Sequence, residues 1–436
     1  MGCVSLASWG WYHNFAVCQK PEIFVGEGYL KQAVLPNCSF LLNTFRPTVW
    51  ASHRHVQTIL GLLRKLSIKA TYTRQNILSS DGGTLGLDWW EGSLKFDYAP
   101  HDTPILLVLH GINGGSHEGY CKWACATAAS KGWRAVVLNY RGCNGVPLTS
   151  PRGYAATMTH DVSRAVSAIK GLYPEAPLLA AGYSLGGLVL AKYLGEADMG
   201  MHSSYNTHGV LSPHSAYEGS GITAAAVISS PICMDRSSRN LARPFSFSFL
   251  YNLAIAYKLR EYISEHEEAI RAQAGPMDID AALNKWTMKE IEDEGLPAQF
   301  GYSSRLEYYG HASSLEYIPN IRTPTLFLQS KDDPFLGVLP DMECSDNPYT
   351  LLAATARGGH VAFMQGLMPL GRAYMDDAVI QFLDSVLKHY PAQTGTAGRA
   401  AESKTLLPSL SEAADTNNVG DPIEVSLFHQ HHRSRL

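Results

Sequence analysis

The amino terminus of this 436-residue sequence has neither a basic region nor an apolar run long enough for a signal peptide or a membrane span. Basic stripes are also missing, and with a formal net charge of −4 this argues against nucleic acid as a partner. The eight cysteines are scattered, with no CxxC pair and no spacing typical of a metal site. These absences favour a reducing compartment and a protein that needs no metal and no organic cofactor.

What the sequence does have is an alternation of short, continuously apolar stretches with helical ones. Apolar runs without a polar face are typical of strands that are buried on both sides of a parallel sheet. We therefore predict an α/β fold with a mainly parallel, doubly covered sheet. The expected strands are 103–111, 133–142, 176–184, 223–231, 323–333 and 349–359, and the expected helices are 118–132, 160–174 and the stretch that follows residue 184.

Two stretches interrupt this alternation. One is rich in Gly, Ser, His and Tyr and is expected to be a loop, while the other is long and helical and is expected to be a cap over the ligand-binding edge of the sheet. A helical surface insertion without a part in binding is the alternative. The predicted organisation is an N-terminal extension packing on the core (1–70), a core in two parts (71–234 and 323–391) with the loop at 196–221, the cap (235–322) and a disordered tail (392–436).

The string GYSLGG at 182–187 follows an apolar run and leads into a helical stretch. A glycine-flanked serine between a strand and a helix is typical of a nucleophile elbow. The turn at the serine is so sharp that side chains two residues to either side would collide, which explains Gly182 and Gly186. An ordinary strand-to-helix turn can carry the same string by chance, so a role for Ser184 depends on finding its partners.

A serine hydroxyl is a weak nucleophile at neutral pH, so it needs a histidine base, and the base needs a carboxylate that orients it. On sheets with such an elbow the order along the chain is serine, acid, histidine. SKDDPF follows one predicted strand and GGHVAF follows the last. We predict a triad of Ser184, Asp333 and His360, with Asp332 as the competing acid.

Attack on a carbonyl also requires hydrogen-bond donors for the oxygen that gains charge. We expect one donor to be the backbone N–H of Leu185 at the start of the elbow helix. The second is expected in the glycine-rich loop HGINGGS, as the backbone N–H of Ile112. A glycine-rich turn without function is the alternative for that loop.

Several of these segments together resemble the YheT-like branch of the α/β-hydrolase superfamily. The motifs that carry the resemblance are HGINGGSHEGY, RAVVLNYRGCNGVPLTSPRGY, YPEAPLLAAGYSLGG, SKDDPF and RGGHVAFMQG. The resemblance implies an α/β-hydrolase fold and a serine esterase or lipase acting on acyl esters, monoacylglycerols or phospholipids. The family roles then fall on Ser184, Asp333 and His360. Many members carry an N-terminal membrane anchor that this sequence lacks, so we expect at most a peripheral membrane contact.

The expected activity is hydrolysis of carboxylic esters through an acyl enzyme, as in a monoacylglycerol lipase or a short- to medium-chain esterase. Two alternatives remain. An acyltransferase would pass the same acyl group to an alcohol, although no HxxxxD string supports a separate acyltransferase site. A non-catalytic binding member of the fold would be expected to lack one of the triad residues.

Both ends of the chain carry candidate targeting signals. Gly2 and Cys3 would suit dual lipidation, but Leu6 stands where the myristoylation motif has Ser or Thr. The last residues, Ser434, Arg435 and Leu436, are a conservative variant of the peroxisomal SKL address, which would be read by an import receptor. Cytoplasmic residence is the alternative. The preceding His431, His432 and Arg433 are interpreted as a solvated basic tail rather than a metal site.

Overall fold

The apolar runs form the middle of a nine-stranded sheet in the computed structural model, which describes residues 10–94, 100–201, 219–272 and 275–390. The strand order is β1-β9-β8-β7-β6-β4-β5-β3-β2, and β4 to β9 pair in parallel. All residues of these six strands are buried, which confirms the predicted α/β fold with a doubly covered, mainly parallel sheet. The six strands are β4 (Ile105–Leu109), β5 (Arg134–Asn139), β6 (Leu178–Tyr183), β7 (Ala224–Ile228), β8 (Thr325–Ser330) and β9 (Thr350–Thr355).

Antiparallel strands, which the apolar runs do not predict, close both edges of the sheet. The short strand β1 (Glu22–Phe24) pairs with β9 at one edge. At the other edge the hairpin of β2 (Tyr72–Leu78) and β3 (Thr84–Trp90) pairs with β5. Strand β2 is only partly buried, as is usual for an edge strand, so its sequence lacks the continuous apolarity of the central strands.

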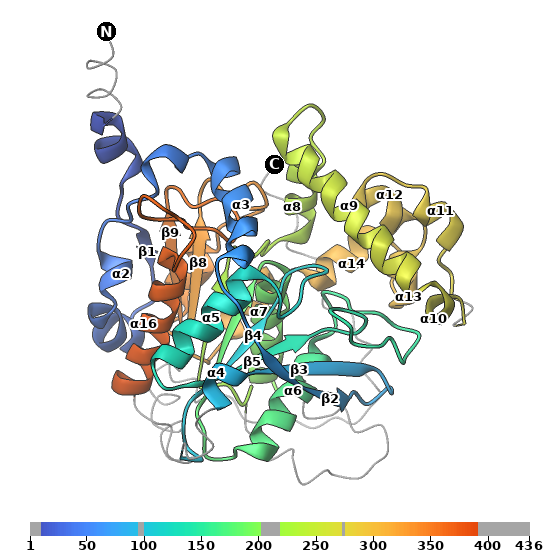
Figure 1. The fold of residues 1–436 in the computed structure, drawn as a ribbon, viewed down its shortest axis with the longest axis horizontal. Helices are drawn as coiled ribbons and strands as arrows, with labels where there is room; N and C mark the ends of the chain where they lie inside the picture. Colours follow the sequence, from blue (N-terminus) through green and yellow to red (C-terminus); the bar gives the residue numbers. More distant parts are fainter. Residues whose placement is uncertain (1–9, 95–99, 202–218, 273–274, 391–436) are drawn as a thin grey trace, which may run out of the picture. The chain divides into compact units, whose positions relative to one another are not determined.

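Helices cover the two faces of the sheet (Figure 1). Successive strand residues point to opposite faces, so Leu107 belongs to one buried cluster and Leu106 to the other. The first cluster includes residues of α6 and α7, and the second includes residues of α5 and α16. These helices are α5 (Gly119–Ser130), α6 (Thr159–Leu172), α7 (Leu185–Asp198) and α16 (Tyr374–His389), with the short α4 (Glu91–Leu94) after β3 and α15 (Asp341–Asp346) between β8 and β9.

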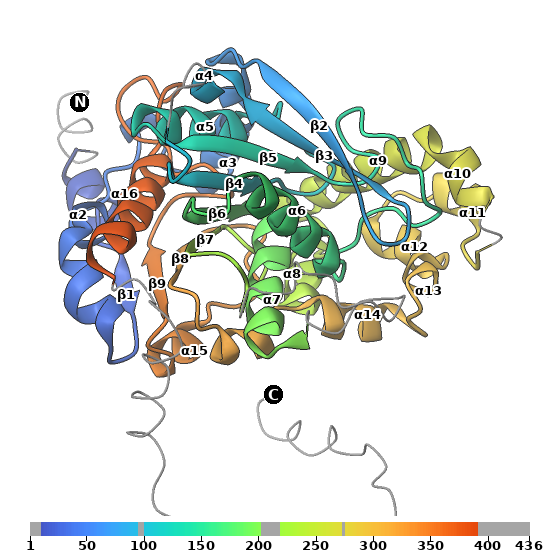
Figure 2. The same cartoon turned by 90° about the horizontal axis from the view of Figure 1, so that it is seen from below.

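The segment between β7 and β8 is helical, and Figures 1 and 2 show α9 to α13 gathered beside one end of the sheet. It has a small apolar core of its own, built around Ala256, Ile263 and Ile291. Its helices are α8 (Met234–Leu241), α9 (Phe247–Glu265), α10 (Glu267–Arg271), α11 (Ile279–Leu283), α12 (Met288–Asp293), α13 (Leu296–Gln299) and α14 (Arg305–Ala312), followed by η7 (Leu315–Asn320). We call α9 to α13 the cap.

Short helical turns lead from the amino terminus to the hairpin and pack beside α16. The hydroxyl of Tyr374 donates a hydrogen bond to the carbonyl of Phe40 (2.7 Å), and that of Ser385 donates to the carbonyl of Val34 (3.0 Å). These turns are η1 (His13–Val17), η2 (Leu30–Val34), η3 (Leu35–Asn37), α2 (Ser39–Leu42), η4 (Val49–Ala51), α3 (Arg54–Leu63) and η5 (Arg64–Leu66).

Several sequence predictions lie outside the described residues. They are the candidate lipidation site at Gly2 and Cys3, most of the loop at 196–221, the tail at 392–436 and the terminal Ser434–Arg435–Leu436. Among the helices that are described, none is both long enough and apolar enough to cross a membrane.

Candidate active site

Ser184 stands between β6 and α7 in a backbone conformation that side chains rarely adopt, with φ 53° and ψ −119°. The turn leaves no room for β-carbons on its flanks. A β-carbon on Gly182 would lie 2.5 Å from the carbonyl oxygen of Gly186, and one on Gly186 would lie 2.4 Å from that of Leu109. The glycines of GYSLGG are therefore needed for the turn that lifts the serine above the end of the sheet.

The structure brings Ser184, His360 and Asp333 into one chain of hydrogen bonds. The Oγ of Ser184 lies 2.9 Å from Nε2 of His360, and Nδ1 of His360 lies 2.9 Å from Oδ2 of Asp333. Asp333 is buried, and this burial raises the pKa of its carboxyl group while the adjacent His360 opposes the rise. An imidazole that takes the serine proton would therefore be stabilised by a poorly hydrated carboxylate.

Asp332 does not contact the imidazole in this arrangement. Its Oδ1 accepts hydrogen bonds from the hydroxyl of Ser330 (2.6 Å) and from the backbone N–H of Gly359 (3.0 Å). The backbone N–H of His360 is itself bound by Oγ1 of Thr58, at 3.0 Å. Asp332 and Thr58 thus hold the backbone of the histidine loop, and Asp333 holds the imidazole ring.

The loop after β4 passes directly beside the serine. A β-carbon on Gly111 would touch that of Ser184 at 3.4 Å, which is ordinary van der Waals contact. The N–H groups on either side of Ile112 are held by tyrosine hydroxyls, Gly111 by Tyr120 and Asn113 by Tyr154, each at 2.9 Å.

Leu185 is the first residue of α7, and the first N–H groups of a helix have no acceptor within the helix. The helix dipole adds partial positive charge at the same place. Leu185 thus follows Ser184 in the chain, and Ile112 belongs to the loop that passes beside the serine in space. A site for a carbonyl oxygen requires two such backbone N–H donors near the nucleophile.

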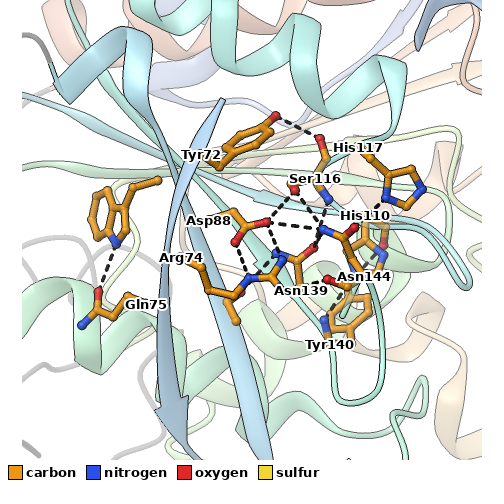
Figure 3. A network of polar contacts seen from close by, with 12 residues as sticks. Tyr72, Arg74, Gln75, Asp88, His110, Ser116, His117, Asn139, Tyr140 and Asn144 are labelled. Atoms are coloured by element: carbon orange, nitrogen blue, oxygen red, sulfur yellow. Dashed lines mark hydrogen bonds and ion pairs between the residues drawn. The ribbon is translucent and has the colours of Figure 1, made fainter. Parts of the chain in front are cut away.

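A buried polar network anchors the far end of this loop at Ser116 (Figure 3). The Ser116 hydroxyl donates to Asp88 (2.5 Å), its N–H donates to Asn139 (3.0 Å), and its carbonyl accepts from Tyr72 (2.9 Å). Arg74 donates twice to the same aspartate, at 2.6 and 2.7 Å. Burial alone would raise the pKa of Asp88, but the hydrogen bonds from Arg74 and Ser116 lower it below its ordinary value. The aspartate therefore stays ionised and keeps its hold on the loop.

His110, at the start of the loop, is fully buried, and its backbone lies against the elbow, since a β-carbon on Gly186 would lie 2.5 Å from its carbonyl oxygen. Burial lowers the pKa of His110 to about 4, so its ring is neutral at neutral pH. Its Nδ1 donates to the carbonyl of Gly111 (2.7 Å), and its Nε2 accepts from the N–H of Tyr140. Both nitrogens are thus used to brace the loop, and His110 does not compete with His360 as a base.

An apolar pocket opens beside Ile112 and Leu185 and runs into the cap. It has about 780 Å³ of empty space, its open mouth included, and Ile112 and Leu185 are part of its wall. The cap supplies Leu259, Tyr262, Ile263, Ile270, Met277, Met288 and Leu296. An acyl chain bound here would have its carbonyl end at the serine. Within the described ranges no group of three or more His, Cys, Asp or Glu side chains could hold a metal ion.

The sequence reasoning missed the residues that position the loops. Thr58, Tyr120 and Tyr154 each hold backbone of the site and none was singled out, although Tyr120 and Tyr154 end the quoted segments HGINGGSHEGY and RAVVLNYRGCNGVPLTSPRGY. For Tyr120 and Tyr154 the signal would have been a tyrosine that ends a glycine-containing segment. Thr58 gives no signal, because its contact joins residues 302 positions apart in the chain.

Comparison with known proteins identifies the family of the chain. The model of the alpha/beta hydrolase family matches residues 105–370. Phospholipase ABHD3 of Mus musculus is 29% identical over 381 residues, 87% of each chain. The putative esterase YheT of Escherichia coli is 28% identical over 79% of this chain and 94% of its own length. Monoacylglycerol lipase of Saccharomyces cerevisiae is 30% identical over 64% of this chain and 59% of its own. The chain belongs to the α/β-hydrolase family, in the branch of YheT and ABHD3, as its motifs predicted.

Proposed function

We propose that the protein is a serine hydrolase that cleaves carboxylic esters of lipids, such as monoacylglycerols or short- to medium-chain acyl esters. The observation that carries the proposal is the hydrogen-bond chain Ser184–His360–Asp333, next to an apolar pocket whose wall includes Ile112 and Leu185, the residue that follows the serine. The names of the relatives, a phospholipase, an esterase and a monoacylglycerol lipase, support the same class of substrate.

The proposed reaction has two halves. His360 takes the proton of Ser184 as its Oγ attacks the ester carbonyl, and the N–H groups of Leu185 and Ile112 bind the oxygen that becomes negative. The alcohol leaves with the proton from His360, so that the acyl group remains on the serine. His360 then takes a proton from water, the water attacks the acyl enzyme, and the acid is released as Ser184 regains its proton.

The test is a chain-length series of p-nitrophenyl esters and monoacylglycerols, with wild type beside Ser184→Ala. The control variant is Ser167→Ala, at a half-buried serine of α6 whose hydroxyl donates only to the carbonyl of Ser163 in its own helix. We expect Ser184→Ala to lower kcat by about a thousandfold or more, since removal of a triad member has effects of this size. Ser167→Ala should match wild type. Unchanged turnover in Ser184→Ala would refute the mechanism.

Adding excess alcohol to the same assay separates hydrolysis from acyl transfer. A hydrolase releases the free acid as its main product, because water reaches the acyl enzyme. Formation of the new ester in preference to the acid would identify the protein as an acyltransferase with the same nucleophile.

A further inference from the structure

Helix α3 has its polar and small residues on the inside and its large apolar ones on the outside. Gln57, Thr58 and Gly61 are buried against the body of the protein. The opposite face carries Val56, Ile59, Leu62 and Leu63, with Leu66 just after the helix, and all five are exposed. Helices of soluble proteins place their apolar stripe toward the core, so this orientation requires a partner for the exposed stripe.

The exposed apolar surface continues on both sides of α3. On one side the indole N–H of Trp50 donates to the carbonyl of Leu367 (2.9 Å), and Leu367 and Met368 are 74% and 78% exposed. On the other side the ring of His55 packs on that of Phe247 at 4.2 Å between centroids. We call this surface the apolar rim, and its members are Trp50, Val56, Ile59, Leu62, Leu63, Leu66, Phe245, Phe247, Leu250, Leu367 and Met368.

The segments that build the rim contain no acidic residue. None of the three segments 28–80, 236–260 and 347–375 contains Asp or Glu. They contain seven, five and two Lys or Arg residues, respectively. The rest of the chain therefore holds all 39 acidic residues. The exposed basic side chains of these segments include Arg46, Arg54, Lys65, Lys69 and Arg243, while Arg372 is exposed and pairs with Asp377 at 3.4 Å. An apolar surface whose own segments carry exposed basic residues and no acidic ones is complementary to an anionic lipid surface.

The rim is also continuous with the candidate active site. A row of aromatic contacts leads inward from Phe247 to Tyr251, then to Phe335, and from Phe335 to His360, with ring centroids 5.8, 5.2 and 3.9 Å apart. Thr58, on the buried face of α3, binds the backbone of His360. The exposed apolar surface thus reaches the candidate active site on the side of His360.

We propose that the apolar rim docks the protein on anionic lipid surfaces, with α3 lying in the interface and the entrance to Ser184 facing the lipid. Apolar side chains enter the acyl boundary and the basic side chains face the headgroups. The docking itself does not depend on catalysis. Its use for taking ester substrates from the lipid surface rests on the proposed function.

The test uses full-length protein with Ser184→Ala, so that vesicle lipids are not consumed, in co-sedimentation with vesicles of phosphatidylcholine alone or mixed with phosphatidylserine. The rim variant is Leu62→Gln/Met368→Gln. Its matched control is Leu172→Gln/Met199→Gln, two exposed residues at the carboxyl ends of α6 and α7, at the other edge of the sheet. We expect stronger binding to the anionic vesicles and a loss of about tenfold or more in the rim variant only.

Equal binding by the rim variant and its control, or no binding by the parent protein, would overturn the proposal. If the parent protein forms dimers in sedimentation velocity that the rim substitutions dissociate, and does not bind vesicles, the partner is a second copy. The same rim substitutions are also made in the protein that keeps Ser184, where turnover of a soluble p-nitrophenyl ester shows that the fold is kept. Vesicle binding by a protein whose wild type cleaves no ester would refute the proposed function and leave the docking surface standing.

Discussion

Two adjacent aspartates in SKDDPF have the same side chain and different surroundings. Asp333 contacts the imidazole of His360, whereas Asp332 contacts Ser330 and the backbone of Gly359. The sequence favoured Asp333 and kept Asp332 as the competing acid, because neighbouring residues in a turn differ only in the direction of the side chain. That direction follows from the pairing of backbone groups in the turn, which a one-dimensional pattern does not contain.

The difference predicts unequal effects of the same substitution. Asp333→Asn should lower kcat by about four orders of magnitude, because an amide no longer orients the imidazole or stabilises its charged form. Asp332→Asn should leave kcat within about tenfold of wild type, since the carbonyl oxygen of Asn can still accept from Ser330 and Gly359. Single-turnover kinetics with a p-nitrophenyl ester checks both. The reverse ranking would move the acid to Asp332.

Helices and strands of this protein differ in how well the local sequence predicts them. The six central strands are continuously apolar because both their faces are covered, and the sequence predicted all six. Strand β1 has three residues and exists through its pairing with β9, so nothing local marks it. Helix α3 reverses the usual relation between apolarity and burial, and periodicity alone would have assigned the wrong face to the core.

The cap contains a buried acid that links its stability to pH. Glu292 lies on α12 in the wall of the pocket and accepts a hydrogen bond from the hydroxyl of Tyr309. Burial raises the pKa of Glu292 from 4.5 to about 7. Between these values the folded state holds a proton that the unfolded state has released, so stability from this group is complete below pH 4.5 and falls as the pH rises to 7.

Replacing this residue by Gln should remove that part of the pH dependence. We expect Glu292→Gln to resemble wild type at pH 4.5 and to be more stable at pH 8, by up to about 3 kcal/mol, because the amide stays neutral and its oxygen can still accept from Tyr309. Thermal unfolding of both proteins across this pH range is the measurement. If the melting temperatures of the two proteins differ by the same amount at every pH from 4.5 to 8, the assignment is wrong.

At the scale of the whole molecule, the triad was the most predictable part of the site. Its residues occur in a fixed order, each after a strand, and parallel strands bring their carboxyl ends to one edge. The pocket was not predictable in this way. Its wall combines residues from the loop after β4, the elbow and four cap helices, so its shape depends on how the cap packs and not on any one segment.

Location in the cell is a property of the full chain, and we propose that Ser434–Arg435–Leu436 directs the protein to a peroxisome-type organelle. A fluorescent protein fused to the amino terminus leaves this end free. We expect a punctate signal from the full-length fusion and a diffuse signal once the three residues are removed. A diffuse signal from the full-length fusion would exclude this address.

The turn that carries Ser184 restricts how this sequence can change over generations. At Gly182 and Gly186 the space for a β-carbon is filled by backbone atoms, so every substitution meets the same obstacle, whatever its chemistry. Ser184 already has a β-carbon in this turn, and its hydroxyl is the group that contacts His360. A lineage could therefore exchange the nucleophile, for example Ser184→Cys, or lose it, while the surrounding turn stays unaltered.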